Sequence, residues 1–168
     1  MNAQSKNTRT TPLILIVDDD AHIREVISFA LEKANLSINE ASNGQQAIEL
    51  LSKSSFDLIV LDINMPEYDG IEVLKFFKQK KITQKVIILS SYDDVKLVQE
   101  MINLGANGFL SKSSAGLHII EAINAVYHGD QYFSDTIKNN LIKLYTGKNV
   151  TSGKRTENTI LNRLKQRK

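Results

Sequence analysis

The sequence contains no cysteine, so neither a disulfide framework nor a thiolate metal site can form. It also lacks a long apolar run near its N-terminus. Residues 13–17 are too few for the hydrophobic part of a secretory signal, and three aspartates follow them. The three histidines lie far apart, without the spacing of a metal-ligating pair. We therefore expect a cytoplasmic protein with no membrane segment.

The formal net charge is only +2, and it is unevenly distributed. Residues 148–168 contain seven lysines and arginines against one acid, so the rest of the chain is net acidic. An acidic body does not favour a nucleic-acid-binding surface. Residues 1–11 are polar and lack periodicity, which predicts a disordered tail, and residues 147–168 are expected to form a basic linker or tail.

The remaining residues alternate regularly between two patterns. Apolar runs typical of strands begin near residues 13, 36, 57, 85 and 108, and after each run apolar residues recur at three- and four-residue steps, as on a helix with one buried face. This alternation predicts an α/β fold, a doubly wound parallel sheet of five strands in the order 2-1-3-4-5, over residues 12–130.

A further amphipathic helix is predicted over residues 134–146, after the fifth helix has ended at Gly129. Ser134 is suited to its N-cap, and Gly147 to its end. The apolar stripe of this helix, which includes Leu141, needs a surface to lie on.

Four of the five predicted strands end in polar side chains. The first runs into Asp18-Asp19-Asp20, the third ends at Asp62, the fourth at Ser90 and the fifth at Ser111-Lys112. In a sheet of this order, the crevice lies at the carboxyl ends of the strands. The sequence therefore predicts one acidic pocket with a hydroxyl and an ammonium group beside it.

Asp18, Asp19 and Asp62 would repel one another unless a cation joined them, and Mg²⁺ is a hard cation that prefers such oxygen ligands. A carboxylate beside Mg²⁺ and the Lys112 ammonium can attack a phosphoryl group, because both cations neutralise its oxygens. The product would be an acyl phosphate on Asp62.

Each of these residues also has a purely structural interpretation. Asp20 is suited to a helix N-cap, Asp62 and Ser90 to turns, and Lys112 to the solvated surface. The functional interpretation depends on their coincidence at four strand ends in the right order.

These motifs closely resemble those of a response-regulator receiver domain of two-component signalling. The matching segments are 14–19 (ILIVDD), 62–70 (DINMPEYDG), 89–93 (LSSYD) and 105–112 (GANGFLSK). The resemblance implies Mg²⁺ bound by the side chains of Asp19 and Asp62 and the backbone carbonyl of Asn64, with Asp18 assisting. It also implies phosphoryl transfer from a sensor histidine kinase or phosphotransfer protein, and autodephosphorylation; the chain would not otherwise be an enzyme.

A conformational switch is expected from Ser90 and Phe109. A phosphoryl oxygen on Asp62 can accept a hydrogen bond from the Ser90 hydroxyl and draw it inward, which opens space that the Phe109 ring can fill.

Residues 121–134 (EAINAVYHGDQYFS) are similar to the end of NarL/FixJ-type receivers, whose linker helix leads to a LuxR-type helix-turn-helix domain. That domain is absent here, because only 21 residues follow the linker helix. We expect control of transcription through an output domain beyond this chain, DNA contact only through that domain, and a phosphorylation-dependent homodimer.

Three alternatives differ from this interpretation. The chain could be a stand-alone receiver that acts by protein-protein interaction in a phosphorelay. A haloacid-dehalogenase-type phosphatase would need an Asp-x-Asp-x-Thr/Ser pattern after the first strand, which residues 18–22 (DDDAH) lack. A flavodoxin-like flavin binder would need a phosphate-binding loop at the same place, where three aspartates repel phosphate.

Overall fold

The computed structural model describes residues 10–92 and 94–147. The expected N-terminal tail lies almost wholly outside them, as does all but the first residue of the expected basic tail. The strands are β1 Leu13–Val17, β2 Ser37–Ala41, β3 Leu58–Asp62, β4 Val86–Ser90, β5 Gly108–Ser111 and β6 Tyr132–Phe133. The helices are α1 Ala21–Lys33, α2 Gly44–Lys53, α3 Gly70–Lys80, α4 Val95–Asn103, α5 Ala115–Tyr127 and α6 Asp135–Thr146, with a 3₁₀ turn, η1, at Lys112–Ser114.

The sheet is wholly parallel, with the strand order β2-β1-β3-β4-β5-β6. The predicted order of the first five strands is confirmed, but the predicted count of five is wrong. A sixth strand of two residues pairs with β5, where Gly108 and Phe109 lie opposite Tyr132 and Phe133. Two residues cannot display the alternation that indicates a strand, so no sequence pattern marked β6.

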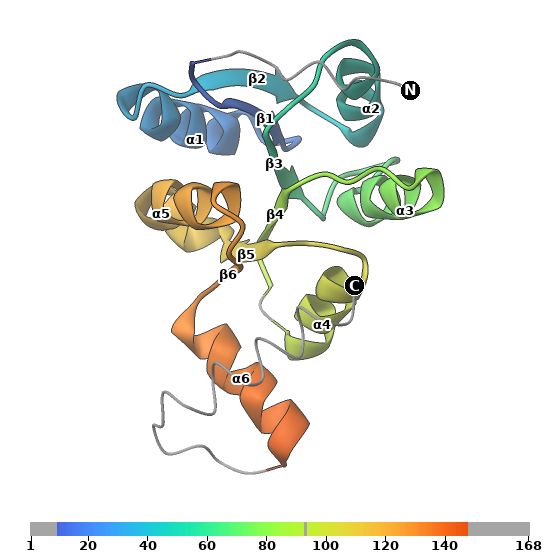
Figure 1. Ribbon diagram of the computed structural model, residues 1–168, viewed down its shortest axis with the longest axis vertical. Helices are drawn as coiled ribbons and strands as arrows, with labels where there is room; N and C mark the ends of the chain where they lie inside the picture. The colour runs from blue at the N-terminus through green and yellow to red at the C-terminus, as the bar shows by residue number, and fades with distance from the viewer. Residues whose placement is uncertain (1–9, 93, 148–168) are drawn as a thin grey trace.

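Helices cover both faces of the sheet, with α1 and α5 on one side and α2, α3 and α4 on the other (Figure 1). The side chains of β1 alternate between these layers: Ile14 and Ile16 belong to the apolar cluster under α1 and α5, and Leu15 and Val17 to the cluster on the opposite face. Burial on both faces explains why β1, β3 and β4 are nearly continuous apolar runs.

Polar residues fix where the helices begin. The Asp69 side chain accepts a hydrogen bond from the backbone N–H of Glu72, whose carboxylate accepts one from the Asp69 N–H, so α3 starts with a capping box. Ser134 caps α6 as predicted, and Gly129 and Gly147 have the positive φ suited to residues just past helix ends. None of the helices in the described part of the chain is long and apolar enough to cross a membrane.

Candidate functional site

The carboxyl ends of β1, β3 and β4 carry Asp18, Asp62 and Ser90. Within the described ranges these three are the only polar residues that are buried, each with none of its surface exposed. Burying two carboxylates in one place is unfavourable unless they are paired or bind a cation. Their position indicates a binding or reaction centre rather than residues that stabilise the fold.

Lys112 is the cation that joins the two carboxylates. Its Nζ lies 2.8 Å from Asp62 Oδ2 and 2.9 Å from Asp18 Oδ2. The other oxygen of each carboxylate accepts a backbone hydrogen bond at 2.9 Å, from the N–H of Asn64 to Asp62 Oδ1 and from the N–H of Asp20 to Asp18 Oδ1. Both carboxylates are therefore held in fixed orientations at the sheet edge.

Asp19 completes a cluster that suits a divalent cation. One carboxylate oxygen each from Asp18, Asp19 and Asp62 lies within 4.8 Å of the others. Asp19 is exposed while the other two are buried, so a cation there would have protein ligands on one side and solvent on the other. Mg²⁺ favours such a site, because it keeps several of its waters.

The electrostatics of Asp62 reflect its burial. Loss of solvent raises the pKa of Asp62 from 3.8 to about 6, and the neighbouring Asp18 charge adds to the rise, against hydrogen bonds from Lys112 and Asn64 that lower it. Burial lowers the pKa of Lys112, but its bonds to Asp62 and Asp18 outweigh that effect and raise it. Lys112 therefore remains an ammonium. Asp62 is ionised at neutral pH, and this ionisation reduces the stability of the folded state.

The raised pKa of Asp62 predicts that the stability of the fold depends on pH in Mg²⁺-free buffer. Because the pKa of Asp62 is higher in the folded state, the folded chain binds more protons than the unfolded chain between about pH 4 and 6. The contribution of Asp62 therefore becomes less favourable as pH rises through this window, by roughly 1–3 kcal/mol. Urea unfolding of the wild type and Asp62→Asn should show the variant more stable at pH 7, with a gap that shrinks by pH 4. A difference in unfolding free energy that stays the same at both pH values would contradict the raised pKa of Asp62.

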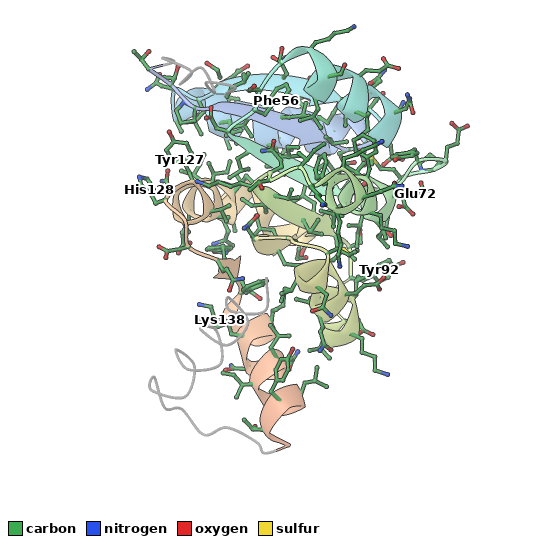
Figure 2. All side chains as sticks on the ribbon, turned by 45° about the vertical axis from the view of Figure 1, so that its right-hand side comes forward. Phe56, Glu72, Tyr92, Tyr127, His128 and Lys138 are labelled. Atoms are coloured by element: carbon green, nitrogen blue, oxygen red, sulfur yellow. The ribbon has the colours of Figure 1, made fainter. Side chains whose placement is uncertain are left out.

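The two residues of the expected switch are both buried. Ser90 Oγ accepts a hydrogen bond from the backbone N–H of Tyr92 at 3.0 Å, and Phe109 is 1% exposed within the apolar cluster of the α3 and α4 face. The Tyr92 side chain instead points outward beside α4 (Figure 2) and is 66% exposed. Asp20, which was not assigned to the site, has the structural role considered for it, as the N-cap of α1.

Two residues that the sequence did not single out also shape the site. Arg24 on α1 donates a hydrogen bond from Nη1 to the carbonyl oxygen of Asp18 at 2.7 Å, which fixes the loop after β1. Gly70 begins α3 against the end of β3, where a Cβ atom would lie 2.3 Å from the Asp62 carbonyl oxygen. Gly70 follows the Asp69 cap in sequence, but nothing in that pattern reveals the close approach to Asp62.

Replacement of Gly70 by alanine should therefore displace the backbone that carries Asp62. The added methyl group meets two main-chain atoms, the Asp62 carbonyl oxygen and Ile63 Cα at 2.8 Å, which cannot rotate away. We expect a loss of about 1–3 kcal/mol of unfolding free energy in urea titrations. Gly116→Ala is the control for the loss of a glycine, since Gly116 lies within α5 and a Cβ there meets only the side chain of Val26, at 3.2 Å. Equal stability of Gly70→Ala and wild type would show that the contact is absent in solution.

Comparison with known proteins agrees with this geometry. Residues 14–124 match the model of the response regulator receiver domain. The chain is 40% identical over 112 residues to the chemotaxis protein CheY of Bacillus subtilis, covering 66% of this chain and 93% of that protein. It is 34% identical over 134 residues to the transcriptional regulatory protein DegU of Brevibacillus brevis, covering 79% of this chain but only 57% of that protein.

Solved structures share the fold. The receiver domain of the Francisella response regulator 1452 is 31% identical with a TM-score of 0.67, over 70% of this chain and 98% of that one. A LuxR-family response regulator from Aurantimonas has a TM-score of 0.75 over 81% of this chain and 99% of that one, at 24% identity, which supports the likeness of fold alone. The protein is thus an α/β signalling domain, and it belongs to the response regulator receiver domain family.

Proposed function

We propose that this receiver accepts a phosphoryl group on Asp62 with the help of Mg²⁺. The observation that supports this most directly is the position of Asp62, buried at the carboxyl end of β3, bonded to Lys112 and within a cluster of three carboxylates. A carboxylate oxygen of Asp62 would attack the phosphorus of a donor such as a phosphohistidine, and the phosphorus-nitrogen bond would break as the imidazole leaves.

The side chains around Asp62 have distinct proposed roles. Asp18, Asp19 and Asp62, with the carbonyl of Asn64, would hold Mg²⁺, which when bound neutralises charge on the transferred group. The Lys112 ammonium would move from the carboxylate oxygen of Asp62 to a phosphoryl oxygen. Water later hydrolyses the acyl phosphate, so the only chemistry proposed for the chain is its own phosphorylation and dephosphorylation.

The test is incubation of the chain with acetyl phosphate, a small donor that needs no kinase. Intact-mass spectrometry should show the gain of one phosphoryl group in Mg²⁺, and none when a chelator removes the metal. Stoichiometric gain in the presence of chelator would contradict the proposed metal site.

For the output of the signal, we propose control of transcription through a helix-turn-helix domain outside these 168 residues. The similarity to DegU supports this, since this chain covers little more than half of that regulator. The match to 93% of CheY favours the second candidate, a stand-alone receiver that acts by protein-protein interaction. Sequence-specific binding of duplex DNA by this chain would contradict both. A histidine kinase or phosphotransfer protein as donor, a phosphorylation-dependent homodimer and a cytoplasmic location remain predictions.

Ser90 is proposed to couple phosphorylation to the surface at α4. Ser90→Ala should accept a phosphoryl group as fully as the wild type, because Asp62 and Lys112 are unchanged. Without the hydroxyl that bonds a phosphoryl oxygen, the amide NMR shifts of α4 and β5 should change little on phosphorylation. Ser91→Ala, at the neighbouring exposed hydroxyl, is the control and should behave as wild type. A full wild-type pattern of shifts in Ser90→Ala would show that the switch lies elsewhere.

A further inference from the structure

A cleft lies at the amino ends of β4, β5 and β6, the edge of the sheet opposite to Asp62. Its volume is about 520 Å³, which is within the range of pockets that bind small molecules. Its walls come from the end of α3, the loop between α3 and β4, the end of α4 and the residues just before β5 and β6. None of the described residues that line the cleft belongs to the candidate phosphorylation site. The cleft is therefore separate from the reaction proposed at Asp62.

Much of the wall of this cleft is apolar. Leu74 and Phe77 of α3 are buried beneath it, and Ile102 and Leu104 at the end of α4 are partly buried. Ile82, in the loop before β4, is 43% exposed and leaves a large apolar side chain in contact with water. A ligand with an apolar body would cover these side chains and remove their surface from water.

Gln131 supplies a hydrogen-bond acceptor that has no partner. Its side chain lines the cleft, and its Oε1 is enclosed without a hydrogen bond from any residue that the structure describes. An unpaired buried acceptor is unfavourable. Rotation of the Gln131 amide toward a donor held in the cleft would satisfy this oxygen. The cleft therefore favours a ligand that carries an N–H or O–H group.

The charge of the cleft is positive. Lys78 and Lys85 are the only charged residues among the described residues that line it. Lys85 Nζ donates a hydrogen bond to the Tyr127 carbonyl oxygen and lies over the Tyr127 ring, 5.3 Å from the ring centroid. Lys78, in the last turn of α3, is exposed and forms no ion pair within the described ranges. Lys78 is therefore the ammonium group that is placed to meet an anion.

We propose that this cleft binds a small carboxylic acid that combines an apolar body with an N–H group. The apolar body would lie against the end of α3 and Ile82, the N–H would donate to Gln131 Oε1, and the carboxylate would meet Lys78. An N-acylated amino acid with a large apolar side chain contains these three parts. The cleft takes no part in the phosphoryl transfer proposed at Asp62, so either proposal can fail without the other.

An NMR titration of the full chain with N-acetylphenylalanine tests the proposal. The backbone amides of Gly105 and Gln131, which line the cleft, should shift and saturate. Half-saturation is expected on the order of 1 mM, as for a ligand of about fifteen non-hydrogen atoms with ordinary efficiency. The amide of Asn64, at the other edge of the sheet, should not move. Asp62→Asn should bind the probe as the wild type does.

Two related probes separate the contributions of the N–H and of the charge in the wild type. O-acetylphenyllactate has an ester oxygen in place of the N–H and should bind about tenfold more weakly, because the Gln131 acceptor stays unpaired. The methyl ester of N-acetylphenylalanine keeps the N–H but is neutral. It should bind about two- to fivefold more weakly, and its affinity should not depend on salt.

Three variants test the same contacts from the side of the protein. Gln131→Leu replaces the amide by an apolar side chain of similar size and should weaken binding of N-acetylphenylalanine about tenfold. Lys78→Ala should weaken it about two- to fivefold, because exposed ion pairs contribute little. Lys80→Ala removes a lysine of the same helical turn that does not line the cleft, and as the control it should bind as the wild type does.

Saturable shifts confined to the cleft, with the expected order of the three probes, would support the proposal. No saturable shift up to about 10 mM probe would overturn it and leave water as the partner of Gln131. Equal affinity for N-acetylphenylalanine and O-acetylphenyllactate would overturn the role of Gln131, even if Gln131→Leu failed to fold. Equal affinities of Lys78→Ala and Lys80→Ala would overturn the binding of the carboxylate by Lys78.

Discussion

Asp62→Asn is expected to reduce phosphoryl uptake from acetyl phosphate or a kinase to background. The amide has nearly the shape of the carboxylate and keeps an acceptor for the Asn64 N–H, but its oxygen carries no charge and is a poor nucleophile. Lys112 and the other carboxylates stay in place. The loss should therefore be of chemistry rather than of fold, as measured by intact mass after incubation with donor and Mg²⁺.

The stability of Asp62→Asn shows whether a loss of phosphoryl uptake comes from the missing nucleophile or from a damaged fold. Asp62→Asn should be at least as stable as the wild type at pH 7 without Mg²⁺, since it removes a buried charge whose pKa is raised to about 6. Asp57→Asn is the matched control at the opposite end of the same apolar run, where the side chain accepts a bond from the Leu13 N–H. It should take up phosphoryl groups normally. Full uptake by Asp62→Asn would contradict the assignment.

Asp19→Ala should have the second largest effect. The rate of phosphorylation should fall on the order of 10²-fold at a fixed Mg²⁺ concentration. Asp19 supplies the solvent-facing carboxylate of the cluster, and the loss of one preorganised electrostatic partner of a developing charge has effects of this size. The measurement is the rate of mass gain across a Mg²⁺ titration. The variant should need far more Mg²⁺ or show no response to it.

Asp20→Ala is the control for Asp19. Asp20 is the adjacent aspartate, but its side chain caps α1 and does not belong to the three-carboxylate cluster. Its replacement should cost about 1 kcal/mol of stability and leave the Mg²⁺ dependence unchanged. If Asp20→Ala and Asp19→Ala reduced the rate alike, the effect would come from general negative charge rather than from a ligand.

The central strands β1, β3 and β4 could be predicted because they are buried on both faces. Such strands are unbroken apolar runs, so the polar residue that ends each one stands out, as Asp62 does after residues 58–61. The structure brings Asp18, Asp62 and Lys112 into contact from three separate strand ends, as the order of strands implied. The roles assigned to these residues remain proposals.

Other features depend on contacts that no local pattern records. β6 has two residues, and its pairing with β5 depends on how α5 returns the chain to the sheet edge. Arg24 reaches Asp18 only because α1 packs beside the end of β1. The amphipathic stripe of α6 predicted that the helix lies on a surface, but not that the surface is α4, because a stripe of Ile and Leu fits any apolar face.

The most direct test of the account is chemical mapping of the phosphoryl group. Borohydride reduces an acyl phosphate on an aspartate to homoserine and leaves phosphoserine intact, so tandem mass spectrometry of the reduced, digested chain identifies the acceptor. The account predicts homoserine at position 62, formed only in samples phosphorylated with Mg²⁺. Homoserine at position 18 or 19, or phosphate retained on Ser90, would contradict it.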